Sequence, residues 1–114
     1  MTEEQIKKEY SKLLMEQIEA TTACNYYLDK HIHLLLEIQE LHKEWKLKRE
    51  FDNLSDEELD KRNVELTSLV VRIESANELQ KVVGRLKEKS QRKMNEINHK
   101  IAQFSKRHGV ENAL

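Results

Sequence analysis

Hydrophobic residues repeat at alternating steps of four and three along the first half of the chain. This spacing places them on one face of an α-helix and is typical of a coiled-coil seam. We therefore expect a long helix over about residues 3–50, roughly 70 Å long at about 1.5 Å per residue. The members of this inner row are Ile6, Tyr10, Leu13, Gln17, Ala20, Cys24, Tyr27, His31, Leu34, Ile38, Leu41 and Trp45.

A second row of mostly apolar residues runs beside the first one. Two adjacent rows make a face that is wider than one neighbouring helix can cover. The pattern therefore predicts contact with two or more helices. This second row consists of Leu14, Ile18, Thr21, Asn25, Leu28, Ile32 and Leu35.

The second half of the chain continues the same heptad spacing and predicts a helix over about residues 56–108. Three more apolar residues, Val70, Leu79 and Leu86, widen its face. The inner row consists of Leu59, Leu66, Leu69, Ile73, Ala76, Gln80, Val83, Lys87, Ser90, Met94, Ile97, Ile101 and Phe104.

The start of the second helix is marked by the sequence LSDEEL, residues 54–59. Ser55 and Glu58 have the spacing of a capping box, in which the Ser hydroxyl accepts from the Glu58 backbone N–H and the Glu58 carboxylate reaches back. Thr2 and Gln5 have the same spacing at the start of the first helix. We expect residues 51–55 to form the connector, Gly109 to form a left-handed cap and residues 109–114 to form a short tail.

A short connector between two long helices favours an antiparallel hairpin. Charge favours it too, because the basic end of the first helix (Lys43–Arg49) would lie near the acidic start of the second (Asp56–Asp60). We predict one all-α domain over residues 1–114: an antiparallel hairpin of two long coiled-coil helices that assembles into a roughly four-helix bundle. The alternatives are one continuous rod and a three- or four-helix monomer, broken near Thr21–Asn25 and near Gly84.

Composition limits the classes of partner. Charged residues make up 36 % of the chain, but 20 basic residues balance 21 acidic ones, which gives no overall attraction to nucleic acid or to an anionic membrane. No apolar run approaches the roughly 20 residues that span a bilayer, and the N-terminus does not read as a signal peptide. With Cys24 as the only cysteine, we expect an intracellular protein, cytoplasmic or nuclear.

The sequence offers little for catalysis. The five histidines lack the spacing of a metal site, and two glycines cannot build a phosphate-binding loop. We therefore expect no enzyme activity, metal, cofactor or small-molecule substrate. His31 lies in the inner row, where it is a register-setting polar position or, alternatively, a pH-sensitive contact.

These observations predict a non-enzymatic coiled-coil scaffold or adaptor that binds helices of its own kind or of another subunit. One alternative is a helical chaperone that shields a client's amphipathic helix. Another is a nucleic-acid-associated protein using the basic segment Lys81, Arg85, Lys89, Arg92 and Lys93, which we rank lower because no aromatic residues interleave there. The expected partner-binding residues are Leu14, Ile18, Leu28, Ile32, Leu35, Leu66, Leu69, Ile73, Leu79, Val83 and Leu86.

Overall fold

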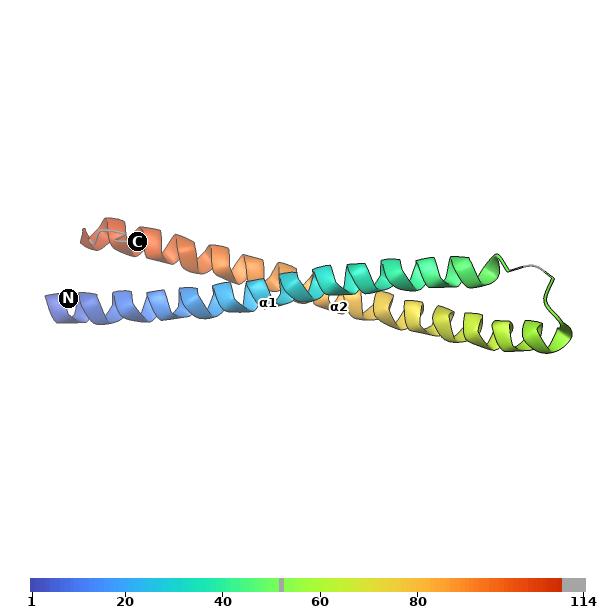
Figure 1. Ribbon diagram of the computed structural model, residues 1–114. Helices are drawn as coiled ribbons and strands as arrows, with labels where there is room; N and C mark the ends of the chain where they lie inside the picture. Colours follow the sequence, from blue (N-terminus) through green and yellow to red (C-terminus); the bar gives the residue numbers. More distant parts are fainter. Residues whose placement is uncertain (52, 110–114) are drawn as a thin grey trace. The chain divides into compact units, whose positions relative to one another are not determined.

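The computed structural model describes residues 1–51 and 53–109 and contains two long helices (Figure 1). Helix α1 spans Glu3–Arg49 and helix α2 spans Asp56–His108. No strand occurs in the described residues, so the predicted all-α, two-helix fold is confirmed. Asp52 of the expected connector and the expected tail after Gly109 lie outside the described residues.

The chain divides into two compact units, to which both helices contribute. Unit 1 contains Met1–Leu28 and the chain from Arg85 on. Its two helical segments are antiparallel, because contacts that advance along α1 move backward along α2. The ring of Tyr10 stacks on that of Phe104 with centroids 6.2 Å apart, while the Thr21 hydroxyl lies 3.7 Å from the sulfur of Met94.

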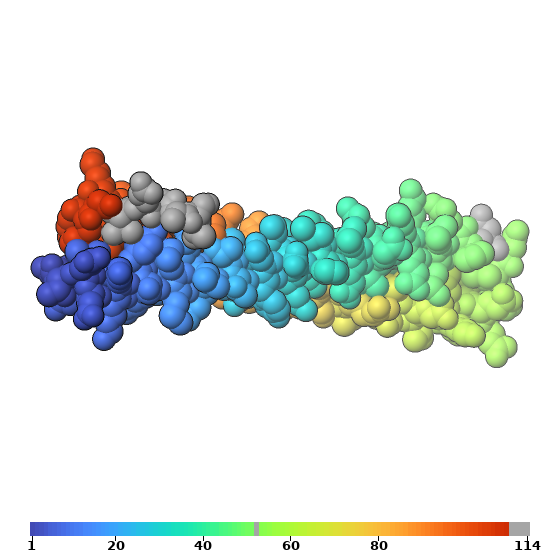
Figure 2. Space-filling model, turned by 60° about the vertical axis from the view of Figure 1, so that its left-hand side comes forward, coloured from blue at the N-terminus to red at the C-terminus, as the bar shows by residue number. Residues whose placement is uncertain are grey.

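Unit 2 contains Asp29–Gly84 and is a helical hairpin, because the connector lies within it. Leu41 packs with Leu69 and Ile73, and the Lys48 ammonium lies 2.7 Å from the Glu65 carboxylate. These contacts make the hairpin antiparallel. In the space-filling view, the cyan-to-green part of α1 lies against the yellow part of α2 (Figure 2).

Both helices begin at the predicted capping boxes. The backbone N–H of Gln5 donates to the Thr2 hydroxyl at 3.2 Å, and the Thr2 N–H donates to the Gln5 side chain at 2.8 Å. At α2, the Glu58 N–H donates to the Ser55 hydroxyl at 3.2 Å as predicted. The Glu58 carboxylate, however, accepts from that same hydroxyl at 2.9 Å. The Ser55 side chain therefore holds both bonds of this cap.

The helix ends use left-handed backbone conformations. Asn53, in the connector, has φ of 59°, a region that asparagine tolerates better than most residues. Gly109 follows α2 with φ of 63° and is the left-handed residue that the sequence predicts. In addition, the Arg62 guanidinium donates to the backbone carbonyl of Phe51 at 3.0 Å, which ties the connector to α2.

Neither helix is broken at the weak positions. Helix α1 continues through Thr21–Asn25 and α2 continues through Gly84, so the alternative with broken helices is wrong. The Thr22 hydroxyl donates to the backbone carbonyl of Ile18 at 2.8 Å, one turn earlier. This local bond satisfies the Thr22 hydroxyl inside the continuous helix.

The predicted inner rows form the core. Every member of both rows is buried or half-buried, whereas most of their neighbours are exposed. Unit 1 buries Ala20, Cys24, Ile97 and Ile101, and unit 2 buries Leu34, Ile38, Leu41, Leu69, Ile73, Ala76 and Val83. The contact between the two helices therefore buries the heptad seam.

Candidate functional site

The residues expected to bind partners fall into three groups by exposure. Leu69, Ile73 and Val83 are buried in unit 2 and belong to its own seam. Leu14 and Leu66 are half-buried. The remaining six are exposed and are the ones a partner could reach: Ile18, Leu28, Ile32, Leu35, Leu79 and Leu86.

On α1, unit 2 carries an apolar patch formed by Ile32, Leu35 and Leu36, which we call the α1 patch. Leu35 is 41 % exposed and Leu36 is 55 % exposed, although both are large aliphatic side chains. Ile32 and Leu36 are four residues apart and therefore neighbours on the helix surface. Sequence reasoning missed Leu36, because it belongs to neither heptad row, but its spacing from Ile32 was the available signal.

On α2, unit 2 carries a second apolar patch formed by Leu79 and Val82, which we call the α2 patch. Both side chains are more than two-fifths exposed. Sequence reasoning selected Leu79 and missed Val82, which lies three residues further on and thus on the same face. Leu28 and Leu86 are similarly exposed in unit 1.

The two patches lie on opposite sides of unit 2. In the heptad, Leu35 follows its seam residue Leu34 and flanks the seam on one side. Leu79 precedes its seam residue Gln80 and flanks the seam on the other side. In an antiparallel pair, the flank whose residues follow the seam on one helix lies beside the flank whose residues follow the seam on the other helix. The flanks whose residues precede the seam likewise lie together on the opposite side. The α1 patch and the α2 patch therefore face away from each other.

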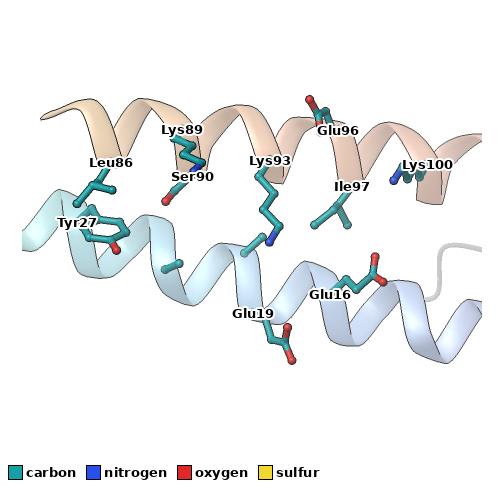
Figure 3. Close-up of a pocket in the computed structure, with 12 residues that line it drawn as sticks. Glu16, Glu19, Tyr27, Leu86, Lys89, Ser90, Lys93, Glu96, Ile97 and Lys100 are labelled. Carbon is teal, nitrogen blue, oxygen red and sulfur yellow. The ribbon is translucent and has the colours of Figure 1, made fainter. Parts of the chain in front are cut away.

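Unit 1 has a groove of about 600 Å³ between its two helical segments (Figure 3). Small side chains leave this hollow, since Ala20, Ala23 and Ser90 line it together with Tyr27 and Ile97. Charged side chains flank it on both helices. Glu16 and Glu19 lie on α1, and Lys89, Lys93, Lys100 and Glu96 lie on α2.

The basic segment of α2 extends over both units. Lys93 and Lys89 line the groove of unit 1, and Arg92 lines a shallow hollow beside Glu88. Lys81 belongs to unit 2 and pairs with Glu78 at 3.1 Å. Arg85 is exposed. Lys81 thus lies in unit 2 and the other four lie in unit 1, where Arg85, Arg92 and Lys93 are each three or four residues from Lys89 and share one side of α2 with it.

Polar side chains interrupt the seam at a few places. Gln17 donates to the Asn98 side chain at 2.7 Å across unit 1, so this inner-row position is satisfied. In unit 2, the Nδ1 atom of His31 is buried and has no hydrogen-bond partner in the described part of the chain. Cys24 is a buried free thiol. Among residues 1–51 and 53–109, no three His, Cys, Asp or Glu side chains come together as a metal site would require.

One ion pair joins the two helices of unit 2. The hydrogen bond from Lys48 lowers the pKa of Glu65 below its ordinary value, and the lysine charge adds to this effect. The same bond raises the pKa of Lys48. Both side chains are roughly one-third to two-fifths exposed, so the pair is screened by solvent.

Searches of protein-family models, curated proteins and solved structures find no match to this chain. A separate property is the hydropathy of the helices. Within the described residues, neither helix has a stretch long and apolar enough to cross a membrane.

Proposed function

We propose that this chain is a non-enzymatic helical scaffold or adaptor subunit that binds partner helices through the α1 patch and the α2 patch. The observation that carries the proposal is the exposure of these aliphatic side chains in a unit whose seam is already filled. Single exposed leucines are ordinary on protein surfaces, whereas grouped ones mark interaction sites. We expect an intracellular setting and no small-molecule substrate.

Covering these patches would contribute a favourable free energy to binding. Fully burying a Leu, Ile or Val side chain contributes about 1.5–3 kcal/mol, so covering the exposed part of each contributes about 1 kcal/mol. The five patch residues together would therefore contribute about 5 kcal/mol. Further contacts around the patches would add to this figure, and the cost of association would reduce it.

Two patches on opposite sides support a scaffold more than a chaperone. A subunit with two separate contact faces can hold two partner helices at once, one on each side. A chaperone that shields one client helix needs a single continuous face. In the predicted four-helix bundle, a neighbouring pair of helices would cover one patch. This bundle remains part of the proposal.

The test is the double variant Ile32→Asp and Leu35→Asp, which places two charges in the α1 patch. The matched control is Thr22→Asp and His33→Asp, which adds the same charge to exposed positions of the same helix outside the patch. Light scattering over a concentration series gives the mass, and circular dichroism on the same samples gives the helix content. We expect the wild type and the control to assemble and the patch variant to lose mass while remaining helical.

Two results would contradict the proposal. One is a patch variant with the same mass as the control at every concentration. The other is a wild-type chain that stays a fully helical monomer throughout, since its patches would then need no partner.

A further inference from the structure

The groove of unit 1 separates its charges by helix. Its α1 wall carries Glu16 and Glu19 and has a net charge of −2. Its α2 wall carries three lysines and one glutamate, which leaves +2. Figure 3 shows Lys93 extending from α2 toward α1, whereas Glu96 points away from α1. The groove therefore has one acidic wall, one basic wall and no overall charge.

These charges form no ion pair with one another in the described residues. In the described part of the chain, the ion pairs are Lys7–Glu3, Lys43–Glu40, Lys48–Glu65 and Lys81–Glu78, and none of them includes a groove residue. The walls thus present opposite charges to an incoming surface. A surface that satisfies both walls must itself carry a basic strip beside an acidic strip.

We propose that the occupant of this groove is the same groove of a second copy of the chain. The two copies are related by a two-fold axis that runs parallel to the helices. Rotation about this axis places α1 of one copy over α2 of the other and preserves position along the helices. Each acidic wall then faces a basic wall, which is the self-complementarity that a two-fold interface requires.

Other occupants match the groove less well. A two-fold axis perpendicular to the helices would place α1 over α1 and α2 over α2, so that each wall would meet a wall of the same sign. A nucleic acid would meet the lysine wall favourably but would be repelled by the two glutamates. The hollow itself suits close approach, because Ala20, Ala23 and Ser90 leave room above the seam.

The size of the groove sets the expected strength of the contact. It runs from Glu16 to Tyr27 on α1, about 17 Å at about 1.5 Å per residue, and the helix pair is about 20 Å wide. This is smaller than the roughly 800 Å² that each partner contributes to a standard interface. We therefore expect a weak dimer that salt weakens further.

This inference rests on the proposed function in one respect: it takes a second copy of the chain to be a partner. It is tested by charge reversal in the full chain, with sedimentation equilibrium up to about 1 mM protein and circular dichroism as the folding control. One variant reverses the basic wall by Lys89→Glu, Lys93→Glu and Lys100→Glu. The other reverses the acidic wall by Glu16→Lys and Glu19→Lys.

We expect each variant alone to dimerise at least tenfold more weakly than the wild type, because its two walls carry the same sign. An equimolar mixture of the two variants should dimerise again, since every wall then faces its opposite. A chain carrying all five reversals should also recover. Recovery in the mixture shows that the variants are folded and that the contact lies between copies.

The inference is overturned by a wild type that stays monomeric, by single-wall variants that dimerise as the wild type does, or by a mixture that fails to recover. A wild type that stays monomeric also counts against the proposed function, whereas the other two outcomes concern the groove contact alone. The Ile32→Asp and Leu35→Asp variant has an intact groove and should keep the groove contact, whereas the charge variants have intact patches.

Discussion

The substitution Leu69→Ala, compared with Leu79→Ala, tests how the two helices divide their leucines between seam and surface. Leu69 is 4 % exposed and packs against Leu41, Ile73 and Trp45, whereas Leu79 on the same helix is 45 % exposed. Truncating a buried leucine generally costs about 2–5 kcal/mol. We expect about 2–3 kcal/mol for Leu69, because a helix pair open to solvent on its flanks can partly collapse around the cavity.

For Leu79→Ala we expect about 0.5 kcal/mol or less, the usual range for a surface substitution, with alanine slightly favouring the helix. Urea unfolding followed by circular dichroism measures both changes. With a slope of about 1–2 kcal/mol per molar urea, Leu69→Ala should lower the midpoint by roughly 1–3 M. The midpoint of Leu79→Ala should hardly change at low protein concentration.

The dependence of these two stability costs on protein concentration provides a second test. If a second copy covers the α2 patch, the cost of Leu79→Ala should grow as the protein concentration rises, because assembly then stabilises the wild type. The cost of Leu69→Ala should not follow concentration in the same way. Equal costs for the two substitutions in dilute protein would refute the division into seam and patch.

Three further predictions follow from individual contacts. Glu65→Gln should be destabilising near neutral pH and neutral in strong acid. The stabilisation from a carboxylate of lowered pKa is complete above its ordinary pKa and is lost as the pH falls through the lowered value. A difference from wild type that persisted in urea titrations at about pH 2 would therefore contradict the pairing with Lys48. His31→Leu should raise the free energy of unfolding by about 1–2 kcal/mol, because the Nδ1 atom is buried without a partner in the described residues, and an unchanged or lower thermal midpoint would oppose this. Ser55→Ala should cost about 1 kcal/mol by removing the cap of α2, measured against Ser68→Ala at an exposed position inside the same helix.

Local spacing made most of the fold predictable. The heptad rows, the Ser55 cap and the Gly109 terminus depend on residues within one or two turns of each other, so their chemistry is readable in the sequence. The wide face of α1 was predictable for the same reason. Leu28, Ile32 and Leu35 are exposed because the inner row, one step away, already fills the seam.

Contacts across the pair were less predictable, because they depend on the exact register of two helices. The basic end of α1 was expected to lie near Asp56–Asp60, yet the one cross-helix ion pair among the described residues joins Lys48 to Glu65, a little further along α2. The other three ion pairs among the described residues join charges three or four residues apart on one helix. The groove of unit 1 was missed because it forms only where Ala20 and Ala23 face Ser90.

The seams of the two units differ in their residue types, and this difference connects the two proposals. The buried side chains of unit 2 are mainly Leu, Ile and Val, whereas those of unit 1 include Ala20 and Cys24 and its inner row also contains Lys87 and Ser90. Unit 1 therefore gains less from its own helix contact and has more to gain from a second copy. The contact proposed there is charged and should weaken with salt, while the patches of unit 2 are apolar and should not. Ionic strength should thus remove the groove contact and leave patch-mediated assembly in place.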